Sequence, residues 1–275
     1  MTSYLDDLID FTDARVASAL DEVSGWSARF AQMIYQHLEL RQPLTALDIG
    51  CGTGVPLLEL AQMHGAACQF SGVDVWEAGL ERAAYKLGSY GLRNVHLHKI
   101  DGARLPFAAA HFDLLVSNLG VNNFEDPEAM LAECARVAKN GARLVITTNI
   151  VGHMREFYAV FRETLAGNPA ALARLAENEA QRGTRESHVR LIENAGFRIA
   201  RVIEDAFALR YADGSAFLNH WLIRLGFLDA WRRVLEKADE RATFAALEAR
   251  LNTLAAQQGE LRLTVPMLYI EALRA

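Results

Sequence analysis

Short apolar runs alternate with helical segments over residues 43–150, and this alternation constrains the fold more than any other feature of the chain. Five segments read as strands: TALDIG, CQFSGVDV, VHLHKID, FDLLVSNL and ARLVITTNI. Strands that are apolar on both faces and separated by helices predict βαβ units, with a parallel sheet covered on both sides. Right-handed crossovers then give a doubly wound α/β sheet that binds its ligands at the carboxyl ends of the strands.

The two ends of the chain follow a different pattern. Residues 5–40, 152–182 and 214–258 carry helical apolar spacing, whereas FRIARVIEDAFALRY and LRLTVPMLYIEAL read as long strands. We therefore expect a helical cap over residues 1–40, a ligand-binding core over residues 41–150, and a C-terminal part over residues 151–275. This last part would complete the sheet and add helices, and all three would form a single domain.

Composition excludes several classes of protein. A net charge of −6 argues against a nucleic-acid partner, which calls for a basic surface, and no apolar run is long enough to span a membrane. The acidic N-terminal segment lacks the basic start and apolar core of a signal peptide. Cys51, Cys68 and Cys134 are odd in number and irregularly spaced, which fits reduced thiols rather than disulfides or a metal site. We expect a cytoplasmic protein without a metal; its oligomeric state, a homodimer included, stays open.

The segment LDIGCGTG places three glycines, Gly50, Gly52 and Gly54, directly behind the first predicted strand. Glycine allows backbone angles that other residues avoid, and it lets a ligand approach the amides at a helix N-terminus. A dinucleotide loop would read G-x-G-x-x-G, but Val55 stands where the third glycine is needed. The loop therefore argues against a nicotinamide cofactor.

The same segment, with Asp48 before its glycines, resembles motif I of the class I S-adenosylmethionine-dependent methyltransferases. The resemblance continues in order over residues 44–150, through FSGVDVW, HKIDGARLPF, HFDLLVSNLGVNNF and PEAMLAECARVAKNGARLVITT. It is closest to the small-molecule branch, which includes quinone, sterol and natural-product enzymes. Asn140-Gly141-Ala142 departs mildly from the turn that relatives carry before the fifth strand.

The resemblance implies a seven-stranded Rossmann-like sheet and S-adenosyl-L-methionine as cofactor, with S-adenosyl-L-homocysteine as product. Asp74 would grip the ribose hydroxyls, Asp101 would accept a hydrogen bond from the adenine amino group, and Trp26 in SGWSARF would lie against the methionine part. The full set of cofactor residues that it implies is Asp48, Gly50, Cys51, Gly52, Gly54, Asp74, Val75, Asp101, Gly102, Ala103, Asn118, Leu119 and Trp26.

Candidates for the acceptor side come from loops that follow the strands and from the added helices. His153 is our candidate for a general base, and Asn122 for orienting the acceptor; a helix-start position and a turn cap are their structural alternatives. Asn123, Tyr158 and Tyr211 are further candidates for binding the acceptor. Turn formation explains Asn123 at least as well, and core packing is the default explanation for Tyr211. For a sixth residue, His188, helix capping is the better explanation.

Together these features predict transfer of a methyl group, by in-line displacement, to an O, N or C atom of a small-molecule acceptor. A nucleic-acid amino-methyltransferase would carry an N/D/S-P-P-Y/F/W run after the fourth strand, where this chain has SNLG. Two alternatives remain at this point: a catalytically silent cofactor-binding subunit, and an NAD(P)-dependent oxidoreductase.

Overall fold

The computed structural model describes residues 3–6 and 9–275, and the chain divides into two compact units. The sheet unit comprises Asp10–Thr148, Gly183–Glu204 and Met267–Ala275, and the helical unit comprises Met1–Ile9, Asn149–Arg182 and Asp205–Pro266. These boundaries differ from the three consecutive segments expected from the sequence, because two long strands each contribute residues to both units. The functional division at residues 40 and 150 stays a prediction.

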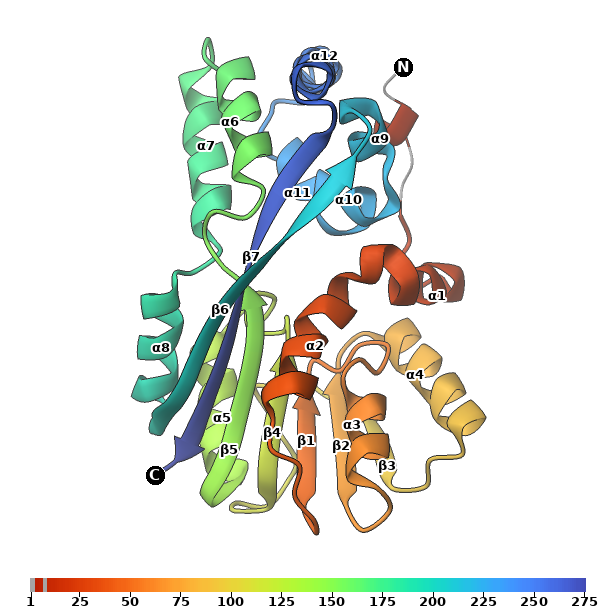
Figure 1. Ribbon diagram of the computed structural model, residues 1–275, viewed down its shortest axis with the longest axis vertical. Helices are drawn as coiled ribbons and strands as arrows, with labels where there is room; N and C mark the ends of the chain where they lie inside the picture. The colour runs from red at the N-terminus through yellow and green to blue at the C-terminus, as the bar shows by residue number, and fades with distance from the viewer. Residues whose placement is uncertain (1–2, 7–8) are drawn as a thin grey trace. The chain divides into compact units, whose positions relative to one another are not determined.

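The sheet confirms the doubly wound α/β fold. Its first five strands are β1 (Thr45–Ile49), β2 (Gln69–Asp74), β3 (Val95–Lys99), β4 (Phe112–Asn118) and β5 (Ala138–Asn149). The pairs β1–β2, β1–β4, β2–β3 and β4–β5 are parallel. With β6 (Phe197–Tyr211) and β7 (Leu261–Arg274), the order is β3-β2-β1-β4-β5-β7-β6. Figure 1 shows β7 antiparallel to its neighbours β5 and β6, so the seven-stranded sheet is mixed.

The strand order fixes where a ligand can bind. The chain leaves β1 toward β2 and β3 on one side, and then returns to β4 on the other side of β1. Asp48 lies level with Gly72 of β2 and Val116 of β4, so the carboxyl ends of these strands meet at one edge. A crevice outside the strand ends forms where the order reverses, which is the usual ligand site of such sheets.

Helices pack on both faces of the sheet unit. They are α1 (Ala14–Glu22), α2 (Trp26–His37), α3 (Leu57–His64), α4 (Glu77–Tyr90), α5 (Pro127–Val137) and α8 (Arg185–Asn194). In Figure 1, α2 and α3 lie in front of the strands and α5 behind them. Asp13, Asp126 and Thr184 cap the starts of α1, α5 and α8 with their side chains. The helical stretch expected near the N-terminus is broken at Gly25, whose φ of +58° interrupts it before α2.

The helical unit contains α6 (Arg155–Thr164), α7 (Pro169–Ala180), α9 (Gly214–Asn219), α10 (Trp221–Gly226), α11 (Leu228–Arg232) and α12 (Glu240–Gln258), besides a short 3-10 helix, η1 (Ser3–Leu5). Its core is aromatic: the rings of Phe157 and Trp231 lie 4.1 Å apart, and both side chains are buried. In the described part of the chain, none of the helices has the length and apolar character needed to cross a membrane.

Candidate functional site

The loop between β1 and α3 has the backbone shape that its glycines allow. Gly50, Gly52 and Gly54 have φ angles of +75°, +49° and +97°. The amides of Gly50 and Cys51 both donate to the carbonyl oxygen of Val73, at 2.9 and 3.1 Å, which holds the loop against the end of β2. Because side chains rarely tolerate such angles, substitution at these glycines would distort the loop.

Asp74, the last residue of β2, is fixed by two backbone amides. Its Oδ2 accepts from the amide of Gly52 at 2.7 Å, and its Oδ1 accepts from the amide of Trp76 at 2.8 Å. A carboxylate has about four acceptor positions, so both oxygens keep capacity for a ligand's hydroxyl groups. The next side chain, Val75, is 64% exposed, which leaves an apolar surface beside a charged group.

Asp48 presents the opposite situation, because its carboxyl group is buried. It is 2% exposed, and neither oxygen forms a well-directed hydrogen bond within the described part of the chain. Burial first, and then repulsion by Asp74, raise the pKa of Asp48 to about 8, although the amide of Leu57 at the start of α3 works against this. The acidic side chain directly before the glycine loop is therefore largely neutral at pH 7.

The segment after β3 packs directly on the end of β1. Asp101 is exposed, and its Oδ1 accepts from the amide of Ala103 at 3.0 Å. Gly102 is buried, and a Cβ placed on it would lie 2.8 Å from Cγ2 of Ile49 and 2.9 Å from Cε1 of Phe124. The close approach explains the glycine, and it brings the carboxylate of Asp101 to the same edge as the glycine loop.

The end of β4 is locked by side-chain hydrogen bonds. Ser117 Oγ donates to the carbonyl of Ile49 at 2.8 Å, and Thr147 Oγ1 donates to Asn118 Oδ1 at 2.7 Å. Leu119 follows with a φ of +64°, which is rare for a side chain of this kind and is a form of strain that concentrates at functional sites. Asn118 Nδ2 also donates to the carbonyl of Ser27 at 3.1 Å, so the start of α2, with Trp26, lies beside this strand end.

Two further contacts tie the N-terminal segment to the same edge. Trp76 Nε1 donates to the carbonyl of Phe11 at 2.6 Å. Asp21 of α1 pairs with Arg82 and Lys86 of α4, at 2.7 and 2.9 Å, and also hydrogen-bonds Thr53 inside the glycine loop. Residues 11–27 are therefore joined to the glycine loop and to the ends of β2 and β4. No pattern in the sequence indicated the contact between Asp21 and Thr53.

Comparisons with known proteins agree with this geometry. Residues 47–146 match the family described as "Methyltransferase domain". The chain is 33% identical to a demethylmenaquinone methyltransferase of Mycobacterium sp. (strain KMS) over 169 residues, 56% of this chain and 68% of that protein. This chain belongs to the class I S-adenosylmethionine-dependent methyltransferases.

Other curated relatives match this methyltransferase over longer or shorter parts of the chain. It is 25% identical to nocamycin O-methyltransferase of Saccharothrix syringae over 252 residues, 87% of this chain and 89% of that protein. For several other curated relatives it spans 48% to 66% of their length. Among solved structures, the YcgJ protein of Bacillus subtilis superposes with a TM-score of 0.61 at 16% identity, over 90% of this chain and 98% of that chain, which shows the shared fold.

The cofactor of the methyltransferase is S-adenosyl-L-methionine, and the residues at the strand ends fit it. The carboxylate of Asp74 retains acceptor capacity for two neighbouring hydroxyls, and Val75 offers an exposed apolar side chain next to it. Asp48 is a buried acid without a well-directed hydrogen bond among the described residues. All thirteen residues that the sequence implied for the cofactor lie in the sheet unit, on β1, β2, β4, the loops that follow β1 to β4, or the start of α2. Their individual roles stay predictions.

Asn122 lies just beyond the cofactor residues of β4 and is held at both ends of its amide. Its Nδ2 donates to Thr148 Oγ1 at 2.6 Å, and Nε2 of His188 lies 3.2 Å from its Oδ1. The other ring nitrogen of His188 lies 2.8 Å from the carbonyl oxygen of Thr184, the N-cap of α8. The imidazole of His188 therefore contacts both the start of α8 and the side chain of Asn122. The contact with Asn122 was not predicted from the sequence.

Asn123, by contrast, serves the turn. Its Nδ2 donates to the carbonyl of Leu119 at 2.9 Å, its own amide donates to the carbonyl of Gly120 at 2.8 Å, and its side chain is exposed. This matches the turn-forming alternative considered from the sequence, and a role in acceptor binding stays a prediction.

The remaining acceptor candidates lie in the helical unit. His153 is buried and its ring stacks on that of Phe227 at 5.2 Å. Burial and the charge of Arg182 lower the pKa of His153 well below its ordinary value, so the ring is neutral at pH 7 but a weak base. Tyr158 donates to Asn178 Oδ1 at 3.1 Å and accepts from Trp231 Nε1 at 3.0 Å. Tyr211 packs 5.2 Å from the ring of Phe217, and burial raises the pKa of its hydroxyl to about 12.

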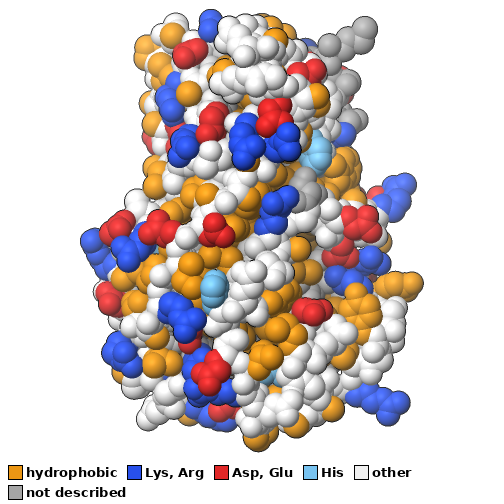
Figure 2. Space-filling model, viewed as in Figure 1, with side chains coloured by type: hydrophobic (Ala, Val, Ile, Leu, Met, Phe, Trp, Pro, Cys, Tyr) orange, Lys and Arg blue, Asp and Glu red, His pale blue; other side chains and the backbone are white. Residues whose placement is uncertain are grey.

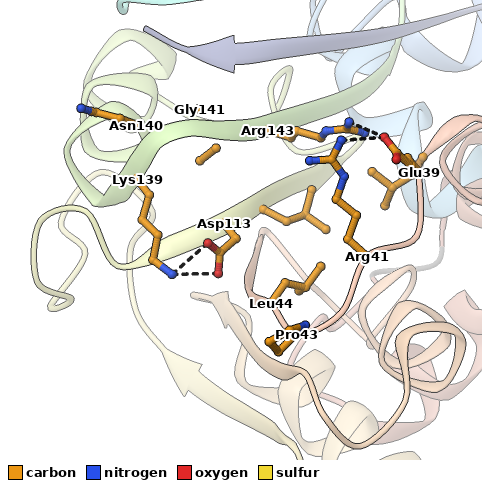
Figure 3. A pocket seen from close by; sticks show the side chains of 12 residues that line it. Glu39, Arg41, Pro43, Leu44, Asp113, Lys139, Asn140, Gly141 and Arg143 are labelled. Atoms are coloured by element: carbon orange, nitrogen blue, oxygen red, sulfur yellow. Dashed lines mark hydrogen bonds and ion pairs between the residues drawn. The ribbon is translucent and has the colours of Figure 1, made fainter.

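A cavity of about 260 Å³ is lined by residues at the amino ends of β1, β4 and β5, opposite the glycine loop. Figure 3 shows its side chains. Its charged side chains satisfy one another: Lys139 Nζ lies 2.8 Å from both oxygens of Asp113, and Glu39 accepts from both Arg41 and Arg143. Because these charges are already paired within the lining, the cavity offers little to an ionic ligand. On the face shown in Figure 2, cationic and anionic side chains are interspersed.

Proposed function

We propose that this methyltransferase transfers the methyl group of S-adenosyl-L-methionine to an O, N or C atom of a small organic acceptor by in-line displacement. The single observation that carries the proposal is the amide of Asn122, which is braced by His188 and Thr148 directly beyond the cofactor residues of β4. A braced amide costs little entropy when it orients a ligand. Similarity to nocamycin O-methyltransferase over 87% of the chain supports a small-molecule acceptor.

The chemistry asks the protein mainly for alignment. When bound, S-adenosyl-L-methionine supplies an already activated methyl group. Asp74 and Asp101 would hold its nucleoside part, and the segments that carry Trp26, Asn118 and Leu119 would exclude water. Holding the acceptor atom in line with the methyl group supplies much of the rate by proximity.

A general base is needed only if the acceptor loses its proton at a pKa well above the working pH. We propose that Asn122 orients the acceptor through its amide. A role of His153, Tyr158 and Tyr211 in acceptor binding stays a prediction from the sequence. The depressed pKa of His153, caused by burial and then by Arg182, suits a neutral acceptor ligand better than a strong base.

The test is the formation of S-adenosyl-L-homocysteine with a panel of acceptors that includes hydroquinones, enolic acids and phenolic polyketides. We expect at least one of them to raise product formation well above the rate without acceptor. Asn122→Ala should lower kcat roughly five- to hundredfold, the value of one to two lost hydrogen bonds, while the affinity for S-adenosyl-L-homocysteine stays within about threefold.

Asn140→Ala is the matched control, since Asn140 is exposed and lines the cavity at the far end of the strands. It should leave both quantities unchanged. Cofactor binding without turnover on any acceptor of the panel would instead favour the alternative, a catalytically silent cofactor-binding subunit. The oxidoreductase alternative is set aside by the family assignment.

A further inference from the structure

Within the described residues, neither oxygen of the buried carboxyl group of Asp48 forms a well-directed hydrogen bond, and the amide of Leu57 is the one donor that acts on it. We propose that Asp48 distinguishes S-adenosyl-L-methionine from S-adenosyl-L-homocysteine, by giving up a proton when the former binds and keeping it when the latter binds. Because Asp48 lies at the cofactor end of β1, this inference rests on the cofactor assignment made above.

The groups that face Asp48 leave it in a negative environment. Asp74 faces it from the end of β2, the thiol of Cys51 from the glycine loop, and the hydroxyl of Tyr35 from α2, which also feels Glu59 of α3. The amide of Leu57 at the start of α3 is the favourable contribution. No Lys or Arg is among the groups that act on Asp48 in the described structure, so a positive charge that favours ionisation at pH 7 must come from the ligand.

The two forms of the cofactor differ by one such charge. S-adenosyl-L-methionine carries a sulfonium, an ammonium and a carboxylate, with a net charge of +1, whereas S-adenosyl-L-homocysteine has lost the sulfonium charge and is neutral overall. An added positive charge stabilises the ionised form of a nearby acid, and low local dielectric strengthens the effect. The proton of Asp48 would therefore pass to solvent when S-adenosyl-L-methionine binds.

Methyl transfer removes the sulfonium charge, and Asp48 would then take a proton back from solvent. The ionised carboxylate stabilises bound S-adenosyl-L-methionine. The neutral acid gives no such stabilisation to bound S-adenosyl-L-homocysteine, so the product is released more easily. Since burial and Asp74 place the pKa of Asp48 near 8, the group is mostly protonated at pH 7 before binding. Asp48 would thus set the preference for substrate over product.

Calorimetric titration at pH 7 in two buffers of different ionisation enthalpy measures the protons released on binding. We expect S-adenosyl-L-methionine to release about half a proton or more in excess of S-adenosyl-L-homocysteine, and its affinity to rise up to about tenfold per pH unit between pH 6 and 7.5. The cofactor's own amino group titrates near pH ~8, but this contribution is retained in a variant of Asp48.

Asp48→Asn keeps the size of the side chain and cannot ionise, so the excess proton release should fall to near zero. Asp101→Asn is the matched control: its exposed carboxylate is screened by water, so the variant should weaken both ligands to a similar extent and keep the excess. Equal release by wild type for the two ligands, or an excess that survives in Asp48→Asn, would overturn the proposal.

A measurement on the wild type guards against failure of Asp48→Asn to fold. Difference infrared spectra should show the carbonyl stretch of a protonated carboxyl group lost on binding S-adenosyl-L-methionine and retained with S-adenosyl-L-homocysteine. The same band change with both ligands would refute the role of Asp48, yet leave the methyltransferase assignment intact. Absence of binding by either ligand would contradict both.

Discussion

Gly120 lies where β1 and β4 meet at the site, and we predict that Gly120→Ala damages both stability and cofactor binding. The added Cβ would overlap Ser117 Oγ, and would lie 3.1 Å from the carbonyl oxygen of Ile49 and 3.2 Å from Cε2 of Phe124. Overpacking of this kind costs about 1–3 kcal/mol, and losing the hydrogen bond from Ser117 to Ile49 adds about 1 kcal/mol. We therefore expect a loss of about 2–4 kcal/mol.

Thermal unfolding followed by circular dichroism measures the effect. At roughly 2–4 °C per kcal/mol, the Tm should fall by about 4–16 °C. Affinity for S-adenosyl-L-homocysteine should fall as well, because Ser117 precedes Asn118 and Leu119 directly. Gly88→Ala is the control: Gly88 lies in α4 with nothing within 4 Å of the added Cβ, so it should gain about 0.5–1 kcal/mol. A Gly120→Ala protein as stable as wild type would refute the packing argument.

Three further predictions concern the ion pairs of Asp21, the buried ring of His153 and the hydrogen bond of Trp76. Burial alone would raise the pKa of Asp21, but hydrogen bonds from Lys86, Thr53 and Arg82 outweigh burial and lower the pKa. The ionised carboxylate therefore stabilises the folded state above pH ~4, and this stabilisation is lost as the pH falls further. Asp21→Asn should therefore be less stable than wild type at pH 7 by urea unfolding, with a gap that narrows below pH ~4; a gap independent of pH would contradict this. Burial and Arg182 lower the pKa of His153, so the folded state is penalised as the pH falls below about 6.5, and His153→Phe should lose less stability than wild type between pH 7 and 5. Equal losses for the two proteins would show that His153 is not the group responsible. Trp76→Phe removes the hydrogen bond to Phe11 and should speed amide hydrogen exchange in residues 11–17, while exchange in β1 stays unchanged. Unaltered exchange in residues 11–17 would show that this bond does not hold the segment.

The fold could be predicted from the sequence because its signals are local. The central strands β1 and β4 are short, largely buried runs, and the last four residues of β1 are all buried. The turn after β1 could be predicted from Gly50, Gly52 and Gly54, because only glycine adopts these φ angles readily. Asp74 ends β2 and Asp101 lies two residues beyond β3, as the strand pattern indicated, and the roles of both carboxylates toward the cofactor stay predictions.

What the sequence could not give are contacts set by the packing of distant segments. His188 and Asn122 are 66 residues apart, and their approach depends on how α8 packs near the end of β4. The contact of Asp21 with Thr53 likewise depends on the packing of α1 against α4. Two compact units were not expected either, because a long strand pattern does not show where along its length its partners change.

The most direct test of the central claim is calorimetric titration of the purified protein with S-adenosyl-L-homocysteine, for wild type and Asp74→Ala. Wild type should bind one molecule per chain. Loss of two charge-assisted hydrogen bonds, each worth about 1.5–3 kcal/mol, should weaken binding by Asp74→Ala at least about a hundredfold. An unchanged dissociation constant in Asp74→Ala, or no binding by wild type at millimolar concentration, would contradict a cofactor site at the carboxyl ends of β1 to β4.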